Sequence, residues 1–357
     1  MSTTMLAAVL HGIKDLRLEE RAVPELAPGK ALLRLRRGGI CGTDIHYFEE
    51  GRTGSFVMSA PFILGHEVVG EVVALGEGVH QPEVGQRVVV NPASQCGHCD
   101  YCRSGRGNLC HHISMLGSAS TQPPTNGAFS EFLLIGADQC FPIPPQLDDG
   151  LGAMIEPFAV ALHALKRAGS VAGKQVLVTG GGPIGLLTAI AARAYGATSV
   201  VLSDPVEGRR NIALELGVDC ALDPSANSFK KRSTELARDG FDVAFEASGA
   251  TPALRQAFEA VRKGGTLVQV GIFSSAEVSL PINQLIIREI QISGSFRYGN
   301  VWEEAIRLVA SGRVNLRPLI SRVFPLAEAP AAMALACAKC GVVKVQLDLC
   351  KNGEIPR

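Results

Sequence analysis

The pattern of apolar and polar positions divides the chain into three regions. Residues 1–155 contain short runs that are apolar or alternate between apolar and polar, such as ALLRLRRGGI, EVVGEVVALG and QRVVVNP. Turns rich in Gly and Pro separate these runs. Their length and spacing predict an antiparallel, barrel-like β domain with long loops.

The rhythm changes over residues 156–295. Apolar strands such as KQVLVTG, SVVLSD, FDVAFEAS and GTLVQVG alternate there with helical stretches such as PIGLLTAIAARAYG and TPALRQAFEAVRKG. Repeated strand–helix order predicts an α/β domain with a doubly wound parallel sheet. Residues 296–357 return to turns and mixed segments, and we expect them to rejoin the first domain.

Charge and hydropathy narrow the classes of function. The chain has 34 Lys and Arg against 34 Asp and Glu, and this balance argues against a nucleic-acid-binding protein. Its apolar runs are shorter than the ~20 residues that a membrane span requires. The N-terminus lacks the basic start and apolar core of a secretory signal. We therefore expect a cytoplasmic protein that binds neither nucleic acid nor membrane.

A glycine-rich turn opens the predicted α/β domain. The segment TGGGPIG places Gly180, Gly182 and Gly185 in G-x-G-x-x-G register between an apolar strand and an apolar helix. Gly180 allows the tight turn, Gly182 lets a pyrophosphate approach the backbone, and Gly185 lets the helix pack on the strand. The turn, with Pro183 and Ile184, predicts a dinucleotide site at a helix N-terminus.

The nature of the dinucleotide depends on the end of the next strand. Asp204 follows the strand VVLS about 20 residues after the turn, where an acid binds the ribose hydroxyls. A carboxylate there would repel a 2′-phosphate, which predicts NAD rather than NADP. Arg209 leaves the choice between NAD and NADP open, because an arginine can hold a phosphate, stack near the adenine or pair with Asp204.

Four cysteines lie close together in CGHCDYCRSGRGNLC. Cys96, Cys99, Cys102 and Cys110 have the spacing C-x2-C-x2-C-x7-C. Four thiolates in one short loop can complete a tetrahedral zinc site with no open position, so the site would be structural. Iron–sulfur ligation is the alternative, but the last spacing is too long for the bacterial ferredoxin pattern.

A second set of metal-ligating residue types is spread along the chain. It comprises Cys41 in GGICGTDIH, His66 and Glu67 in PFILGHEVVG, and Glu156 in AMIEPFAVALHA. Cys, His and carboxylate ligands can leave a zinc position open for water or substrate, as a catalytic site requires. Spacing alone does not show whether these four residues bind a metal, since each of them taken singly is common in proteins without metal.

The order of these motifs resembles that of the zinc-dependent medium-chain alcohol and polyol dehydrogenases. GGICGTDIHYFEEGRTGSF, PFILGHEVVG, the four-cysteine segment, IEPFAVALHA, TGGGPIG and SGSFRYGN occur in the family's order, and the similarity covers nearly the whole chain. The resemblance implies a GroES-like β-barrel catalytic domain plus a Rossmann domain, with zinc and NAD as cofactors.

The resemblance also implies roles for single residues. Cys41 and His66 match the catalytic zinc ligands, and Glu67 and Glu156 match two acids of which either can bind the metal directly. Thr43 matches the hydroxyl beside the substrate alcohol, and His46 matches the outer end of the proton relay. Three further residues match positions that line the substrate or cofactor cleft: Tyr47, Arg297 and Tyr298. Phe56 is expected to form an apolar wall of this cleft.

The family implies a class of reaction and leaves the substrate open. The expected reaction oxidises a secondary alcohol of a sugar acid, L-idonate to 5-keto-D-gluconate, or of a polyol such as sorbitol or xylitol. Arg52 and Arg297 could bind a carboxylate, but matching arginines also occur in enzymes for neutral polyols. A zinc-free quinone reductase and a non-catalytic zinc redox sensor are the alternatives, and a homodimer or homotetramer is expected.

Overall fold

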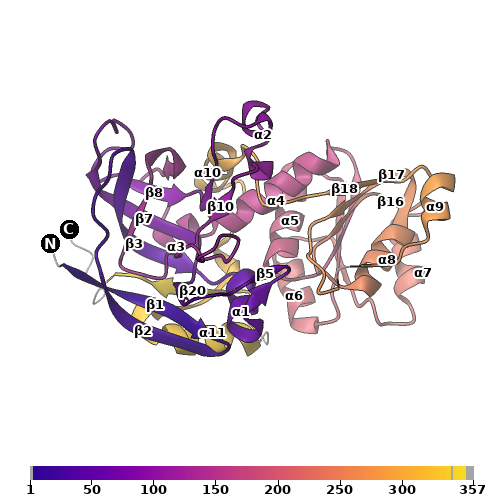
Figure 1. The fold of residues 1–357 in the computed structure, drawn as a ribbon. Coiled ribbons are helices and arrows are strands. Elements are labelled where there is room, and N and C mark those ends of the chain that lie inside the picture. Colours follow the sequence, from indigo (N-terminus) through magenta and orange to yellow (C-terminus); the bar gives the residue numbers. More distant parts are fainter. Residues whose placement is uncertain (1–2, 276, 339–340, 351–357) are drawn as a thin grey trace. The chain divides into compact units, whose positions relative to one another are not determined.

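The chain folds into two compact units. The computed structural model describes residues 3–275, 277–338 and 341–350. Unit 1 is Met1–Glu156 with Trp302–Arg357, and unit 2 is Pro157–Val301 (Figure 1). The structure divides after residues 156 and 301, whereas the sequence predicts boundaries after residues 155 and 295. Residues 296–301 follow the last strand of the parallel sheet and remain with it.

Unit 1 consists mainly of antiparallel strands, as its alternating runs predict. Its larger sheet has the order β12-β8-β7-β3-β20-β19, with β11 also paired to β3, and a smaller sheet has the order β2-β1-β6. The strand bounds are β1 Thr4–Gly12, β2 Asp15–Ala22, β3 Lys30–Gly39, β4 Arg52–Thr53, β5 Phe56–Val57, β6 Phe62–Ile63, β7 Glu67–Leu75, β8 Arg87–Val90, β9 Ala93–Ser94, β10 Ser114–Met115, β11 Phe132–Gly136, β12 Cys140–Pro142, β19 Ile320–Pro325 and β20 Lys344–Asp348.

Strand β20 brings the end of the chain into the sheet that the first domain forms. It pairs antiparallel with β3, so that Gln346 lies opposite Gly39. The same strand β3 pairs with β7, where Gly39 lies opposite Glu67. Residues more than 270 positions apart in the sequence therefore meet at the ends of three neighbouring strands.

Helices in unit 1 are few, and one of them, α10, lies where the sequence predicts turns and mixed segments. The helices are α1 Gly42–Glu50, α2 Asp100–Arg103, α3 Asp149–Gly152, α10 Trp302–Ala310 and α11 Ala329–Ala338. Helix α10 buries Trp302, Ala305, Ile306 and Val309, a spacing of three and four residues that places one apolar face against the core.

Unit 2 contains a six-stranded parallel sheet with the order β15-β14-β13-β16-β17-β18. This confirms the predicted doubly wound α/β fold. The strands are β13 Gln175–Thr179, β14 Ser199–Ser203, β15 Cys220–Leu222, β16 Phe241–Glu246, β17 Val261–Gln269 and β18 Gln291–Gly294. The connecting helices are α5 Pro183–Ala194, α6 Glu207–Glu215, α7 Phe229–Leu236, α8 Thr251–Ala260 and α9 Ile282–Ile287, and α4 Ile155–Ala168 precedes the sheet.

The strand order of unit 2 reverses between β13 and β16. The chain moves outward from β13 to β15 and then returns to place β16 on the other side of β13. In open α/β sheets, ligands bind at the carboxyl ends of the strands at such a reversal. Of the helices that the structure describes, none is both long enough and apolar enough to cross a membrane.

Candidate active site and metal sites

Three of the predicted catalytic residues come together in unit 1. Cys41 precedes α1, His66 lies in the loop before β7, and Glu67 is the first residue of β7. Their ligand atoms lie within 4.8 Å of one another. His66 and Glu67 are 2% and 1% exposed, respectively. A thiol, an imidazole and a carboxylate held this closely are suited to binding zinc.

Glycines make room for this arrangement. A Cβ atom at Gly39 would lie only 2.2 Å from Oε2 of Glu67, so a side chain at position 39 would displace the carboxylate. Gly65 has a φ of +92°, and a Cβ there would lie 2.2 Å from the ring of Phe129. Both glycines therefore allow the strands and the His66 loop to approach closely.

Asp44 links the Cys41 segment to the His66 loop. Its carboxylate, which is fully buried, accepts hydrogen bonds from the backbone N–H groups of Cys41 at 2.9 Å and Gly65 at 3.0 Å. Its Oδ1 lies 3.9 Å from Nδ1 of His66, which has no hydrogen-bond partner. Asp44 thus faces one ring nitrogen and leaves Nε2 for a metal, an arrangement that is common around zinc.

Lys344, from β20, binds the carboxylate of Glu67. Its Nζ donates to both carboxylate oxygens at 2.7 Å and to the carbonyl of Ile40 at 3.0 Å. Burial acts to lower the pKa of Lys344, but the charges of Glu67, Cys41 and Glu156 and the hydrogen bonds to Glu67 together outweigh it, so the pKa is raised. Lys344 and Glu67 therefore form a buried ion pair beside Cys41 and His66.

The electrostatics of the site favour a cation. Burial, and next the negative charge of Glu67, raise the pKa of the Cys41 thiol well above its usual value. A divalent ion would reverse this effect, because a metal-bound thiol loses its proton. Glu156 is 5% exposed and lies outside the group of three ligands. Its charge nevertheless acts on both Cys41 and Lys344, so it belongs to the same electrostatic environment.

Helix α1 positions the residues predicted to handle the substrate proton. Thr43 is half-buried in the first turn, and its carbonyl accepts a hydrogen bond from Thr53. His46 is exposed, with its Nδ1 3.3 Å from Glu50. An exposed imidazole at this place is compatible with proton exchange with solvent, and the relay stays a prediction.

Tyr47 does not line a cleft as predicted. Its side chain is fully buried, its hydroxyl accepts a hydrogen bond from the backbone N–H of Ala119 at 2.9 Å, and its ring packs edge-on against Phe62. Tyr47 faces inward from α1, on the side of the helix that also carries Asp44. Its role is therefore to anchor α1 to the core.

The remaining predicted substrate residues have different surroundings. Phe56 is 39% exposed in the β4–β5 hairpin of unit 1. In unit 2, Arg297 has a φ of +53° and its guanidinium lies 4.9 Å from the ring centre of Phe296, while Tyr298 is buried. The contribution of these three residues to a substrate cleft stays a prediction.

The glycine turn in unit 2 has the geometry that its sequence predicts. Gly180 has a φ of +101°, and a Cβ at Gly185 would lie 1.8 Å from the carbonyl of Gly180. A Cβ at Gly182, in contrast, would meet nothing within 4 Å. Gly185 thus permits close helix packing, and Gly182 faces open space beside the start of α5. Pro183 and Ile184 form the first turn of α5.

Asp204 lies directly beside the glycine turn. Its carboxylate accepts hydrogen bonds from the backbone N–H groups of Gly181 at 2.7 Å and Val206 at 2.8 Å. Arg209 approaches the same carboxylate at 3.5 Å. Of the roles left open for Arg209, the structure shows the pairing with Asp204. Asp204 therefore both supports the turn and stands where the ribose of a bound dinucleotide is expected.

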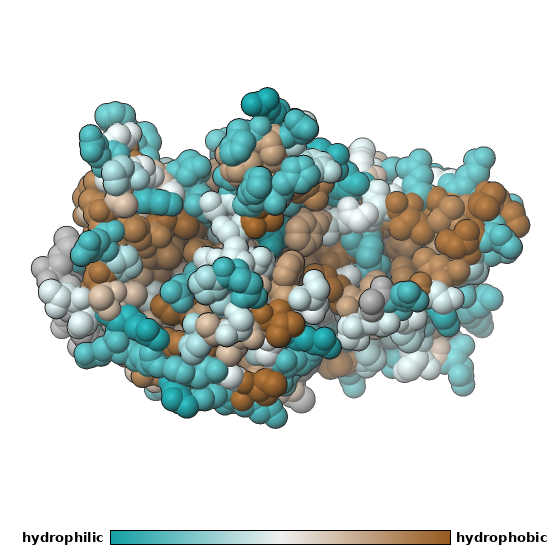
Figure 2. All heavy atoms as spheres, viewed as in Figure 1, coloured by the Kyte–Doolittle hydropathy of each residue, from teal (hydrophilic) through white to brown (hydrophobic). Residues whose placement is uncertain are grey.

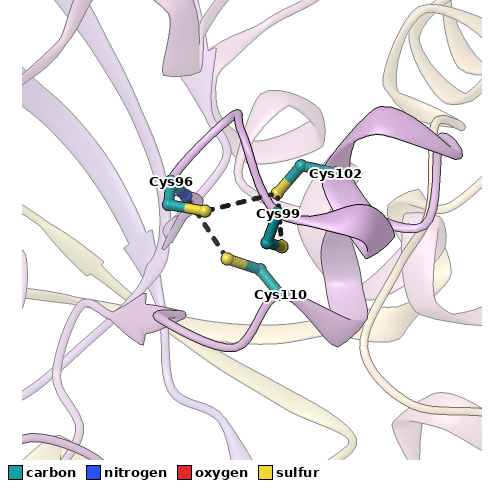
Figure 3. Close-up of side chains that lie close together, drawn as sticks. All are labelled: Cys96, Cys99, Cys102 and Cys110. Carbon is teal, nitrogen blue, oxygen red and sulfur yellow. Dashed lines mark hydrogen bonds between the residues drawn. The ribbon is translucent and has the colours of Figure 1, made fainter.

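The four cysteines of the 96–110 segment converge, as Figure 3 shows. Cys96 and Cys99 lie 3.9 and 3.5 Å from Cys102, sulfur to sulfur, and all four sulfurs are within 4.8 Å of one another. Tetrahedral zinc–thiolate bonds of about 2.3 Å require sulfurs about 3.8 Å apart. The backbone N–H groups of Cys102 and His111 lower the pKa of Cys99 to about 6, which favours the thiolate form. The residues fit a structural zinc site.

Sequence reasoning found the Cys41, His66 and Glu67 group and the four cysteines whose ligand atoms converge, but it missed two residues that contact the first group. Asp44 lies within the GGICGTDIH motif and could have been recognised as a capping residue three positions after Cys41. Lys344 carries no local signal, because its contact with Glu67 spans 277 positions. Only the pairing of β20 with β3 brings it to the site.

Family models match both units. Residues 27–145 match the alcohol dehydrogenase GroES-like domain, and residues 183–311 match the zinc-binding dehydrogenase domain. The first match contains Cys41, His66, Glu67 and the four-cysteine segment. The second begins within the glycine turn.

Similar proteins cover almost the full chain. Sorbitol dehydrogenase from Bacillus subtilis is 36% identical over 93% of each chain. A solved structure of L-idonate 5-dehydrogenase from Escherichia coli is 35% identical, with a TM-score of 0.91 over 98% of this chain and 99% of that one. An Escherichia coli alcohol dehydrogenase solved with NADH is 27% identical, with a TM-score of 0.89 over 97% of this chain and 100% of that one.

Proposed function

Because the chain belongs to the zinc-binding alcohol dehydrogenase family with a GroES-like domain, we propose that it oxidises a secondary alcohol of a sugar acid or polyol with NAD. The preferred reaction is L-idonate to 5-keto-D-gluconate, and the alternative substrates are sorbitol and xylitol. The observation that carries the proposal is the Cys41–His66–Glu67 group, with His66 and Glu67 buried, in a chain that also has the dinucleotide turn.

The residues of unit 1 divide the catalytic task. Cys41 and His66, with Glu67 or Glu156, would hold a zinc ion, which when bound supplies Lewis acidity toward the substrate hydroxyl. The Thr43 hydroxyl accepts the hydrogen bond of the reacting alcohol. His46, exposed on the same helix, passes the proton to solvent, a task for which imidazole is suited near neutral pH.

The substrate class rests on the relatives and on the charges of the chain. One relative is named for sorbitol and another for L-idonate. Arg52, exposed on β4, and Arg297 are the cations that we assign to a substrate carboxylate. Neither arginine separates the two substrate classes, because hydroxyl groups also accept hydrogen bonds from guanidinium.

A substrate panel tests the proposal. NADH formation should be compared for L-idonate, sorbitol, xylitol, galactitol and L-threonine under identical conditions. We expect the highest kcat/KM with L-idonate and measurable turnover of at least one polyol. Preference for a polyol over L-idonate would replace the preferred substrate by the alternative. Turnover of L-threonine alone would contradict both.

We also propose that the enzyme forms a homodimer or homotetramer through the β18 edge of unit 2. Strand β18 ends the parallel sheet, and Ile292 on it is 40% exposed. Ile282, Ile286 and Ile287 on the neighbouring α9 segment are 56–69% exposed. Figure 2 shows apolar side chains gathered over this part of unit 2. Apolar patches of this kind mark interaction sites.

The oligomer is tested by Ile286→Glu, which places a charge in this patch. Sedimentation or light scattering should show the wild type as a dimer or tetramer and the variant as a smaller species. A monomeric wild type would contradict the proposal.

We place the enzyme in the cytoplasm, since a four-thiol metal site requires the reduced cysteines that this compartment maintains.

A further inference from the structure

One buried side chain in unit 2, Glu246, holds two loops at the edge where the strand order reverses. Glu246 is the last residue of β16, is fully buried, and lies opposite Thr179, the last residue of β13. The glycine turn follows β13 directly. Glu246 therefore lies at the carboxyl edge of the sheet, where such folds bind dinucleotides.

The carboxylate of Glu246 accepts hydrogen bonds from both loops. Oε1 accepts from the backbone N–H groups of Ser248 at 2.8 Å and Gly249 at 3.1 Å and from the Ser248 hydroxyl. Oε2 accepts from Gly249 at 3.1 Å and from the side-chain amide of Gln269 at 2.5 Å. Gln269 ends β17 and also donates to the carbonyl of Gly271.

The backbone of Glu246 adds to this arrangement. Its carbonyl accepts hydrogen bonds from the N–H groups of Val270 at 2.8 Å and Gly271 at 2.9 Å. One residue thus binds the loop after β16 (residues 247–250) and the turn after β17 (residues 270–272). We call these two segments the edge loops.

The edge loops and the glycine turn leave no space between them. A Cβ at Gly271 would lie 2.2 Å from the backbone nitrogen of Gly249, and a Cβ at Gly249 would lie 2.3 Å from the carbonyl of Ile272. A Cβ at Gly180 would lie 2.9 Å from Cβ of Ser248. These close contacts show that the Ser248 loop is packed between the turn after β17 and the glycine turn.

The side chains in the interior of β16 offer no hydrogen-bond partner for a carboxylate at the end of this strand. Val243, Ala244 and Phe245 fill the core of the sheet with apolar side chains. A buried carboxylate is costly unless donors surround it, and here the donors come from the edge loops. The carboxylate therefore serves the loops at the ligand-binding edge.

The topology indicates which part of the coenzyme this edge receives. Dinucleotide-binding sheets consist of two mononucleotide-binding halves. The half with β13 to β15 carries Asp204, which is placed for the adenosine ribose. The half with β16 to β18 carries Glu246 and the edge loops, and it is left for the nicotinamide nucleotide.

We propose that Glu246 is a positioning residue that orders the edge loops for the nicotinamide half of the coenzyme. It acts through the backbone of these loops and not through contact with the reacting atoms. Loops that are ordered before binding do not have to be ordered by the ligand, so affinity is higher. The inference rests on the NAD-dependent function proposed above.

The test compares a whole coenzyme with its adenosine half. Dissociation constants for NADH and AMP are measured by calorimetry for wild type, Glu246→Gln and the milder Ser248→Ala, which removes one donor and keeps the carboxylate. Glutamine turns an N–H group toward the donors of Ser248 and Gly249. We expect the dissociation constant for NADH to rise roughly tenfold in Glu246→Gln and by a smaller factor in Ser248→Ala. The dissociation constant for AMP should be the same in both variants as in wild type.

A matched control comes from the other end of the same strand. Asp242 accepts hydrogen bonds from Gln175 and Arg262 at the opposite edge of the sheet, so Asp242→Asn disturbs β16 without touching the edge loops. It should leave the NADH and AMP affinities unchanged. Hydrogen exchange of residues 247–250 and 270–272 should be faster in Glu246→Gln and should slow again when NADH binds.

Two outcomes separate this inference from the proposed function. Equal weakening of NADH and AMP in the Glu246 and Ser248 variants, or no weakening of either ligand, would overturn the positioning role alone. A wild-type chain that binds neither NADH nor AMP would contradict the NAD-dependent function and, with it, this inference.

Discussion

The ion pair of Lys344 and Glu67 determines the charge around the proposed catalytic metal. Both residues are almost fully buried and the lysine nitrogen contacts both carboxylate oxygens. Removing one partner of a buried pair costs about 3–5 kcal/mol, because the other charge is left without compensation. A divalent metal bound beside Glu67 would supply part of the missing positive charge.

We therefore predict that Lys344→Met destabilises the metal-free protein more than the zinc-loaded protein. Thermal unfolding with and without a chelator measures how much stability each protein loses when zinc is removed. This loss should be larger in Lys344→Met than in wild type. Lys344→Arg is the control and should behave nearly as wild type. Equal loss of stability in the two forms would show that Glu67 does not sense the metal.

Asp204 provides a second prediction, about the choice of coenzyme. Asp204→Ser removes the acceptor for the ribose hydroxyls and for the N–H of Gly181. Losing hydrogen bonds to a charged group weakens binding by roughly 10–100-fold. The ratio of kcat/KM for NAD to that for NADP should fall by about this factor. An unchanged ratio in Asp204→Ser would contradict the assignment of Asp204 to the ribose hydroxyls. Adding Arg209→Gln to the Asp204→Ser variant tests whether Arg209 then holds the 2′-phosphate of NADP.

Short motifs at these positions were readable in the sequence, and distant contacts were not. Cys41, His66, Glu67 and Gly180 belong to motifs whose residue types indicate their chemistry. Lys344 and Glu246 lie in ordinary apolar strand sequences, and only strand pairing reveals their partners. Tyr47 was predicted wrongly because a tyrosine near a metal ligand suggests a substrate contact, whereas its position on α1 faces the core.

Among the helices, α4 carries a half-buried histidine, His163, whose titration should affect stability. Burial, and next the charges of Arg167 and Lys166, lower the pKa of His163 to about 4. The unfolded chain, with a His pKa of about 6.5, binds the proton more readily. The native state therefore loses stability as the pH falls from about 6.5 toward 4, and above that range His163 has no effect.

We predict that His163→Asn reduces this loss. The free energy of unfolding, measured by denaturant at pH 7 and pH 5, should fall less in the variant than in wild type. His80→Asn, the same substitution at an exposed position of unit 1, is the control. The same pH dependence in wild type and His163→Asn would contradict the assignment.

The four-cysteine segment should behave as an independent metal site. Cys102→Ser is expected to lower the zinc content by one ion per chain and to increase proteolytic cleavage between residues 96 and 110. Cys140→Ser is the control, since Cys140 is buried in the core of unit 1 and lies outside the metal groups of the described residues. Retention of all zinc in Cys102→Ser would contradict a structural zinc in this segment.

The secondary structure was largely predictable where its period was clear. The runs that predict β3, β7, β8, β13 and β14 are strands in the structure. Helix α10 was missed because Gly and Pro residues surround it, although its buried positions follow the helical period. The order of strands in the larger sheet of unit 1 could not be derived, because it depends on the long-range pairing of β20 with β3.

The molecule as a whole combines a metal-binding β unit with a dinucleotide-binding α/β unit. The matches of the two family models to the two units support one enzyme that needs both. In the proposed function, zinc chemistry resides in unit 1 and coenzyme recognition in unit 2. Variants in one unit should therefore impair turnover without abolishing ligand binding by the other.

The most direct test of the account is NADH formation by wild type and Cys41→Ala with L-idonate and sorbitol, with NADH affinity measured on the same samples. We predict turnover by wild type with at least one of the two substrates. Cys41→Ala should show no turnover, one zinc ion fewer per chain and unchanged NADH affinity. Turnover by Cys41→Ala equal to that of wild type would contradict the central claim that Cys41 holds a catalytic metal.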